Sequence, residues 1–333
     1  MTQPNALPAS LAALDSQYVI HLDQLSLLLA EGEQAAQFLN SQLTIDVSKL
    51  EDGRMRHAAL CDFKGKAWAV LDVARVGDKY VCIGITDAMQ AALAQFQKYS
   101  VFSKVTFSDI TETAQAVFVQ GEAPLVNLNL SASDLPQNEF EVCESEGKTI
   151  IKLNISEAGY LVFHLANTPS SNLRTSLQAN LHYPVAVYDA LSIAKGIPQV
   201  SGDNINTLVS QMFNLQAIDG IDFKKGCYMG QEVVARTRYL GKNKRAAYIV
   251  SVTPATVSAN DVTLERQVGT GWRNAGNIIR SAKLESELWL LVVMPDDVTP
   301  QDQLRITQAP ELMVTMHTLP YTIEQESRSV IKK

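Results

Sequence analysis

The most distinctive chemistry in the sequence lies in residues 223–245, FKKGCYMGQEVVARTRYLGKNKR, which surround one cysteine, Cys227. Glycines stand on either side of it, at Gly226 and Gly230, and the residues from Gln231 onward have the composition of a short helix. A thiol close to a helix N-terminus and beside cations forms its thiolate more readily, and the thiolate is the reactive form of cysteine. The pattern therefore meets the requirements of a reactive thiol, which the glycines would leave open to an incoming group.

The charge of this segment is opposite to that of the whole chain. Seven basic residues accompany the single acid Glu232, a local charge of +6 in a chain of net charge −7. The bases are Lys224, Lys225, Arg236, Arg238, Lys242, Lys244 and Arg245. Such a run indicates either a surface for an anionic partner or an ordinary solvated face. The cysteine likewise has two interpretations, a reactive thiol or a half-buried residue in a tight turn, and its spacing alone favours neither.

The other groups that could do chemistry are dispersed. Cys61 and Cys82 fall in expected strands, which indicates buried thiols, and Cys143 lies in an acidic stretch that disfavours its thiolate. The four cysteines form no CxxC pair and the five histidines show no metal-ligand spacing, so we expect no metal site and no disulfide framework. The glycines of residues 269–276, GTGWRNAG, mimic a phosphate loop, but no strand–helix context follows, which favours barrel turns.

Composition excludes several classes of protein. A chain of 333 residues with 46% hydrophobic and 19% charged residues is long enough and apolar enough to bury sizeable cores. An acidic pI near 5.3 argues against a protein that coats nucleic acid by bulk charge. No apolar run reaches the length of a membrane span, and the first ten residues do not resemble a secretory signal. With four isolated cysteines, these features predict a cytoplasmic protein.

The hydrophobic pattern changes along the chain. Through residue 240, strands expected at 17–31, 57–76, 80–85, 102–108, 115–119, 149–154 and 159–164 alternate with helices expected at 32–39, 86–99 and 188–195. From residue 246 onward the pattern indicates six short strands and almost no helix, which is typical of a small antiparallel barrel or sandwich. We therefore expect an α+β body over residues 1–240 and a β-barrel domain over 241–333, with the boundary near Gly241.

The segment KKGCYMGQE, followed by an arginine at Arg236 and then by NKR, resembles the signature of the YgfZ family. These proteins are folate-binding relatives of the glycine-cleavage T-protein and are associated with tRNA modification and iron–sulfur proteins. Further segments match in the family's order and spacing: LNSQLTIDV at 39–47, CDFKGKAW at 61–68, KYSVFSKV at 98–105, ALSIAKGIP at 190–198 and LPY at 319–321. The resemblance covers nearly the whole chain. It implies a T-protein-like body of intertwined α+β subdomains, a central hole for folate and a C-terminal β-barrel.

The same resemblance assigns roles to individual residues. Cys227 becomes the essential chemical group, supported by a set of motif residues: Lys225, Gly226, Tyr228, Gly230, Gln231, Glu232 and Arg236. Leu25 and Tyr188 occupy the positions of two tryptophans at the folate site, and Trp272 and Arg273 are further candidates to line the hole. Tyr188 keeps an aromatic face worth roughly 0.5–1.5 kcal/mol for stacking on a pterin, whereas Leu25 offers only apolar contact.

Two departures from the family pattern bear on activity. Ala194, in IAKG, stands where the T-protein places a glutamate that grips the pterin, which removes a charge-assisted hydrogen bond of roughly 1.5–3 kcal/mol. A tetrahydrofolate derivative is therefore expected to bind weakly. The acid that the T-protein uses toward its aminomethyl substrate corresponds to Ala69 or Val70, which leaves no evident acid–base group for aminomethyl transfer.

Three functional hypotheses follow. The first is a folate-binding factor for tRNA modification and for synthesis or repair of iron–sulfur proteins, acting through Cys227. The second is a true tetrahydrofolate-dependent aminomethyl transferase. The third is an adaptor that binds RNA or protein through the basic residues 224–245. Expected partners are folate and either tRNA-modifying iron–sulfur enzymes or tRNA itself, with no membrane.

Overall fold

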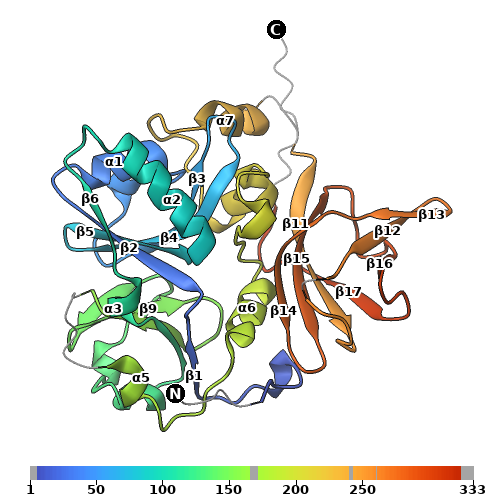
Figure 1. Cartoon of the computed structure of the whole chain (residues 1–333), viewed down its shortest axis with the longest axis horizontal. Helices are drawn as coiled ribbons and strands as arrows, with labels where there is room; N and C mark the ends of the chain where they lie inside the picture. The colour runs from blue at the N-terminus through green and yellow to red at the C-terminus, as the bar shows by residue number, and fades with distance from the viewer. Residues whose placement is uncertain (1–5, 166–171, 240–242, 260, 324–333) are drawn as a thin grey trace.

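Two five-stranded antiparallel sheets form the N-terminal body of this computed structural model, which describes residues 6–165, 172–239, 243–259 and 261–323 (Figure 1). The first sheet contains, in order, β1 (Tyr18–His21), β7 (Val117–Gln120), β10 (Gly159–Phe163), β9 (Lys148–Leu153) and β8 (Val142–Ser145). The second contains β3 (Met55–Cys61), β4 (Ala67–Val76), β5 (Lys79–Ile85), β2 (Leu25–Glu31) and β6 (Thr106–Asp109).

The sheets are interlocked by the chain between residues 17 and 31. The two strands expected there are present as β1 and β2, but each joins a different sheet, so residues 22–24 form a crossover and not a hairpin. The expected α+β body of intertwined subdomains is thereby confirmed. Sequence reasoning missed β8, which lies in a polar stretch and pairs with the buried β9.

Helices cover the outer faces of the sheets. In α2, which spans Thr86–Tyr99 as predicted, Ala88, Met89, Ala92 and Phe96 recur at helical spacing and pack on the second sheet beside α1 (Ala35–Gln42). The other helices are α3 (Thr111–Ala114), α4 (Ala123–Val126), α5 (Leu173–Ser176), α6 (Val185–Ala194) and α7 (Gln231–Tyr239). Short 3-10 helices are η1 (Leu11–Ala13), η2 (Val47–Lys49), η3 (Ala132–Asp134), η4 (Gly202–Asn204), η5 (Ser210–Phe213) and η6 (Leu215–Ile218).

The C-terminal part is the expected antiparallel barrel. Its larger sheet has the order β14 (Asn277–Lys283), β15 (Leu288–Pro295), β11 (Arg245–Thr253) and β17 (Met313–His317). Its smaller sheet has the order β13 (Gly271–Asn274), β12 (Leu264–Val268) and β16 (Leu304–Ile306). β13 corrects the prediction that residues 269–276 are turns: only the hairpin turn at Gly269, with φ of +62°, and the link to β14 are irregular. The predicted boundary at Gly241 lies outside the described residues.

The barrel is joined to the body by buried polar contacts as well as by the core. Asn214, fully buried and in a left-handed conformation, donates to the carbonyl of Ala247 at 2.7 Å and accepts from its amide at 3.1 Å. The Tyr321 hydroxyl donates to the carbonyl of Gly196 at 2.8 Å, and a Cβ at Gly196 would lie 2.6 Å from that hydroxyl oxygen. Two segments that carry the family resemblance, 190–198 and 319–321, therefore meet in space. Among the described residues, no helix has the length and hydrophobicity needed to span a membrane.

Candidate functional site

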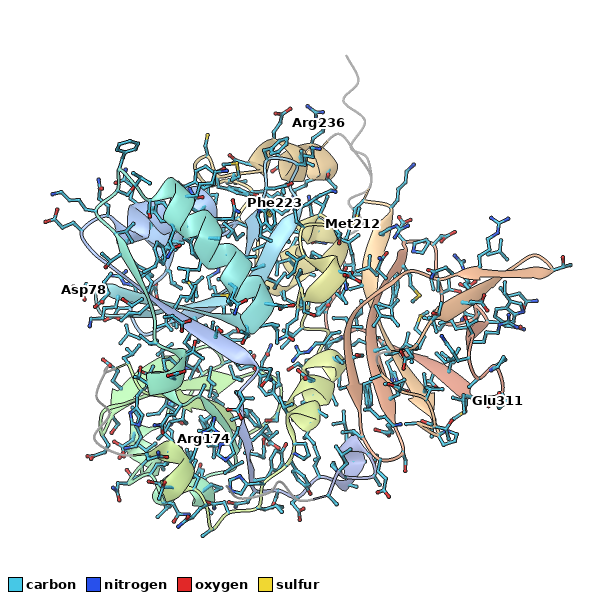
Figure 2. All side chains as sticks on the ribbon, viewed as in Figure 1. Asp78, Arg174, Met212, Phe223, Arg236 and Glu311 are labelled. Atoms are coloured by element: carbon cyan, nitrogen blue, oxygen red, sulfur yellow. The ribbon has the colours of Figure 1, made fainter. Side chains whose placement is uncertain are left out.

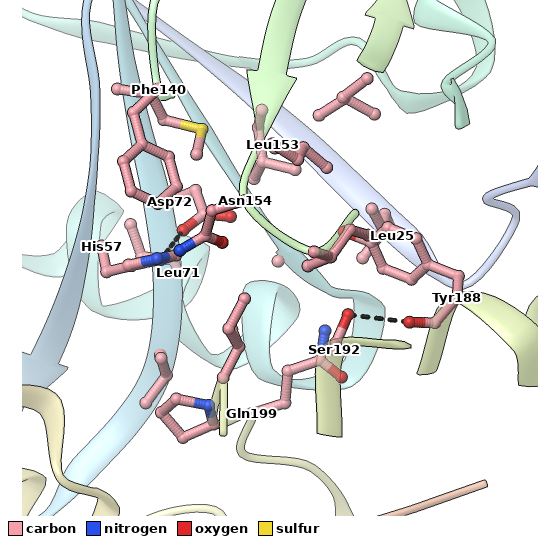
Figure 3. Close-up of a pocket in the computed structure, with 18 of the residues that line it drawn as sticks. Leu25, His57, Leu71, Asp72, Phe140, Leu153, Asn154, Tyr188, Ser192 and Gln199 are labelled. Atoms are coloured by element: carbon pink, nitrogen blue, oxygen red, sulfur yellow. Dashed lines mark hydrogen bonds and ion pairs between the residues drawn. The ribbon is translucent and has the colours of Figure 1, made fainter. Parts of the chain in front are cut away.

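A narrow cavity lies where the two sheets, α6 and the barrel strand β14 meet (Figure 3). The structure places both sequence-predicted folate contacts in its wall: Leu25 at the start of β2 and Tyr188 on α6. Tyr188 is buried, its ring packs edge-on to Phe118 at 5.6 Å, and burial raises the pKa of its hydroxyl well above the usual value. The cavity measures about 40 Å³, which is room for a few water molecules and less than a pterin needs.

The polar side of the cavity is formed by a histidine–carboxylate pair that sequence reasoning missed. His57 on β3 and Asp72 on β4 face each other in the strand register, and His57 Nδ1 lies 2.5 Å from Asp72 Oδ1. His57 is only 5% exposed, and the ring of Phe140 packs edge-on against it at 5.1 Å. Figure 3 shows this pair across the cavity from Leu25 and Tyr188. No signal in the sequence indicated the pair, because the five histidines show no metal-ligand spacing and fifteen residues separate His57 from Asp72.

The barrel contributes Arg280, which also was not predicted. Its side chain is 6% exposed, forms an ion pair with Asp189 at 2.6 Å, and places its guanidinium 5.8 Å from the centre of the Tyr188 ring. Trp272 and Arg273 were expected near this cavity, and that expectation is wrong. Both belong to β13, in the smaller sheet at the outer tip of the barrel, where Trp272 stacks with Arg305 (Figure 1). The glycine-rich sequence around these two residues does not indicate that they lie in the smaller sheet, away from the cavity.

Ala69 and Val70, the positions at which the T-protein comparison found no acid, lie on β4 and face opposite sides of its sheet. Ala69 is buried in the core beneath α1 and α2, whereas Val70 lines the cavity. Asp72, two residues farther along β4, is on the same strand face as Val70 and supplies a carboxylate to the cavity. Ala194 is the last residue of α6, and on that helix it is Ser192 that joins Tyr188 in the cavity wall.

The cysteine segment is attached to the body by one buried lysine. The Lys225 ammonium donates to the carbonyl oxygens of Asn40, Leu43 and Ile45, each at 2.6 Å, and lies 4.9 Å from the centre of the Tyr228 ring. Burial lowers the pKa of Lys225 to about 8, so the side chain remains mostly charged at neutral pH. We expected this lysine to favour the thiolate of Cys227; in the structure its ammonium is bonded to the last turn of α1 and to the loop that follows it.

Gly230 brings the cysteine segment against the turn between β3 and β4. Its φ is +85°, and a Cβ there would lie 2.4 Å from the carbonyl oxygen of Asp62 and 2.9 Å from Cα of Gly65. Only glycine satisfies both the backbone conformation and the close approach. Gly226 differs, because a Cβ there would meet open space. The thiol of Cys227 lies between these glycines and is exposed, in a shallow hollow shared with Phe63 and Met229.

Comparison with known proteins agrees with this arrangement. A family model described as the YgfZ β-barrel domain matches residues 243–309, and one described as the GCVT N-terminal domain matches residues 13–160. The tRNA-modifying protein YgfZ of Colwellia psychrerythraea is 30% identical over 326 residues, covering 98% of this chain and 99% of that protein. Its namesake from Pectobacterium carotovorum is 33% identical over 328 residues, covering 97% and 96%. The chain belongs to the YgfZ family.

The fold comparison extends to a more distant enzyme. The glycine cleavage system aminomethyltransferase T from Bartonella henselae superposes with a TM-score of 0.69 at 15% identity, covering 92% of this chain and 86% of that one. The resemblance predicted from KKGCYMGQE is thus confirmed for family and fold. In this YgfZ chain three of the resembling segments, 39–47, 61–68 and 224–232, converge around Lys225 and Gly230.

The remaining motif residues of the YgfZ segment support its local geometry. Gln231 opens α7 and donates from Nε2 to the carbonyl of Lys225 at 3.3 Å. Glu232 and Arg236 pair with each other one helical turn apart on the exposed face of α7 (Figure 2). Arg238 instead stacks on Phe223 at 4.0 Å.

The basic segment of this YgfZ chain is not one solvated face. Lys224 and Lys244 are exposed, Lys225 is buried, and Arg245 donates to Asn277. Lys242 lies outside the described residues. The +6 charge that stood out in the sequence is therefore distributed between the interior, ion pairs and the surface.

We predict that Lys225→Met destabilises the protein by at least ~2 kcal/mol, because three backbone carbonyls lose their buried donor. The neighbouring variant Lys224→Met removes an exposed charge and is expected to change the free energy of unfolding by less than ~0.5 kcal/mol. Urea unfolding of both variants measures the difference. Equal stabilities would show that the three hydrogen bonds do not hold the segment.

We predict that Cys227 is the first of the four thiols to be alkylated by limiting iodoacetamide near neutral pH. Burial raises the pKa of Cys61 and of Cys82 to about 12, and burial and Glu141 raise that of the half-buried Cys143. These three thiols therefore offer less thiolate and less access than the exposed Cys227. Peptide mass spectrometry measures the order, and faster labelling of Cys143 would contradict it.

Proposed function

We propose that this protein is a folate-binding factor in tRNA modification that acts through the Cys227 thiol and supports the synthesis or repair of iron–sulfur proteins. The observation that carries the proposal is that Cys227 is exposed while the backbone around it is held in place. It is an exposed thiol on a segment fixed by the Lys225 hydrogen bonds and by the contact of Gly230 with the β3–β4 turn. The curated relatives are named tRNA-modifying proteins, which points to the same process and to a cytoplasmic location.

The side chains that line the cavity support folate binding, whereas the small volume of the cavity argues for weak binding. Tyr188 and Leu25 offer an aromatic and an apolar surface for a pterin. Two buried nitrogen atoms without a partner belong to residues of the cavity wall: Nε2 of His57, across from Tyr188 (Figure 3), and Nε of Arg280, whose guanidinium lies beside the Tyr188 ring. A volume of about 40 Å³ requires side chains to move before a pterin enters. This requirement agrees with the weak binding expected from Leu25 and Ala194. When bound, a reduced folate would supply a carrier for a one-carbon unit.

The exposed surface around Cys227 suits a macromolecular partner. Phe63, which is 71% exposed, and Met229 line the same hollow as the thiol. A partner that reaches Cys227 would therefore also contact apolar side chains. Lys224 and Lys244 provide exposed positive charge in residues 224–245. If tRNA contacts this segment directly, its affinity should fall steeply as the salt concentration rises, whereas docking of an iron–sulfur enzyme on Phe63 would change little.

Aminomethyl transfer is the second candidate function, and Asp72 is the observation that favours it. This carboxylate lies in the cavity, close to the position where the T-protein comparison expected an acid. Its Oδ1 is already engaged by His57, however, and the two positions first assigned to the acid are Ala69 and Val70. The first proposal therefore remains the better supported.

We predict that the purified protein releases no ammonia from an aminomethylated carrier protein above the background seen with folate alone. The physical reason is that the carboxylate of Asp72 is paired and no second acid is available at Ala69 or Val70. A coupled ammonia assay measures the rate, with Asp72→Asn as the matched variant. Release by the wild type that Asp72→Asn abolishes would establish the transferase instead.

We predict that Cys227→Ala fails to complement a bacterial strain that lacks its YgfZ protein. The exposed thiol is lost while the buried anchor at Lys225 is untouched, so the variant should keep the stability of the wild type. Modified nucleosides in tRNA, measured by mass spectrometry, provide the readout. Cys143→Ala, which removes a half-buried thiol of the first sheet, is the control and is expected to complement fully. Full complementation by Cys227→Ala would refute the role of the thiol.

A further inference from the structure

Two buried nitrogen atoms in the cavity wall have no hydrogen-bond partner. They are Nε2 of His57 and Nε of Arg280, in side chains that are 5% and 6% exposed. Both residues line the cavity. Other buried atoms of the described residues also lack a partner, but these two belong to residues that line a cavity, where a bound molecule can complete their hydrogen bonds.

Asp72 determines what His57 offers to such a molecule. The carboxylate 2.5 Å from Nδ1 can only accept, so Nδ1 carries the proton. In the neutral ring Nε2 then presents a lone pair and accepts a hydrogen bond, a tautomer that follows from the hydrogen-bond network. Oδ1 of Asn154, also without a partner, is a second acceptor in the same wall as His57, whereas Arg280 presents an N–H donor beside the ring of Tyr188.

This wall faces the aromatic and apolar side of the cavity. Figure 3 shows His57, Asp72 and Asn154 on one side and Leu25 and Tyr188 on the other. A flat heterocycle that stacks on Tyr188 would thus direct one edge toward the acceptors of His57 and Asn154, with the donor of Arg280 beside the ring of Tyr188. A ring whose edge alternates N–H and C=O or ring-nitrogen groups, as a pterin does, matches this combination of acceptors and donor.

We propose that His57, oriented by Asp72, is the residue that selects the heterocycle: its Nε2 accepts a hydrogen bond from an N–H of the ring. The assignment rests on the proposed folate function and extends it to this chain's own residues. Asp72 is a positioning residue that acts through His57. The pair supplies a carboxylate to the cavity. By the T-protein comparison, this chain lacks another carboxylate there, because Ala194 stands where the T-protein has a glutamate.

Phe140 determines how a ring could reach His57. Its ring covers the imidazole at 5.1 Å, while its backbone is fixed at a φ of +60° by hydrogen bonds with Lys152 and Met55, each at 2.8 Å. Beyond Phe140 lies an open hollow of about 260 Å³, which shares His57 with the cavity and is lined by Lys49 and Arg54. Rotation of this one side chain would open a path between the two spaces, into a hollow whose wall also carries the acids Glu51 and Asp219.

The test is a set of calorimetric titrations with 5-formyltetrahydrofolate, using the full chain. His57→Leu is expected to weaken binding about tenfold or more, the usual effect of losing a buried hydrogen bond. His164→Leu is the control, because His164 is also buried with one bonded nitrogen but directly follows β10 of the first sheet and is absent from the cavity wall. It should bind like the wild type. Cooperative thermal unfolding of each variant verifies that it is folded.

Variants of Asp72 separate positioning from simple packing. Asp72→Asn retains an acceptor for Nδ1–H and should weaken binding by less than about threefold, whereas Asp72→Leu should match His57→Leu. The double variant should bind no more weakly than either single Leu variant, because both remove the same contact. Additive losses, or wild-type affinity in His57→Leu, would overturn the assignment alone. No binding by the wild type would overturn the folate role and this assignment together, while leaving the complementation result for Cys227 intact.

Discussion

The burial of one positive charge, that of Lys225, organises the part of the structure that carries the thiol. Transfer of an ammonium from water to the interior costs several kcal/mol unless polar groups replace its hydration. Here three carbonyl oxygens converge on it, and each charge-assisted hydrogen bond returns roughly 1.5–3 kcal/mol. The chain after α1 must therefore adopt the conformation that points these carbonyls inward. The cysteine segment is fixed to the body as a consequence.

The β3–β4 hairpin connects that segment to the central cavity. Its turn, from Asp62 to Gly65, receives the backbone of Gly230, and its strands carry His57 and Asp72 into the cavity wall. His57 precedes Asp62 by five residues, or roughly 17 Å of extended strand. One stiff element thus contacts both proposed sites, and the register that pairs His57 with Asp72 also fixes where the turn meets the thiol segment.

The cavity is complete only when the barrel is docked on the body. Arg280 enters the wall from β14 and is held there by Asp189 of α6, while Asn214 joins the body to β11 through two buried hydrogen bonds. Because these hydrogen bonds and this ion pair cross the interface, separating the barrel from the body would leave further unpaired polar atoms on both sides. Ligand binding in the cavity and the docking of the barrel should consequently stabilise each other.

The sequence alone predicted most of the elements and singled out Cys227 as the candidate reactive thiol. Helical spacing of Met89, Leu93 and Phe96 predicted α2, the series of short apolar runs indicated the barrel, and the contiguous KKGCYMGQE pattern indicated the family. All of these are local signals, because side-chain period and motif spacing are properties of neighbouring residues. Only the tertiary structure decided the polar side of the cavity. His57, Asp72, Asn154 and Arg280 come from four separate segments, and strand register and barrel docking bring them together. The same is true of Lys225, whose partners lie 180 or more residues earlier in the chain, so nothing near it in the sequence could show that its charge is buried.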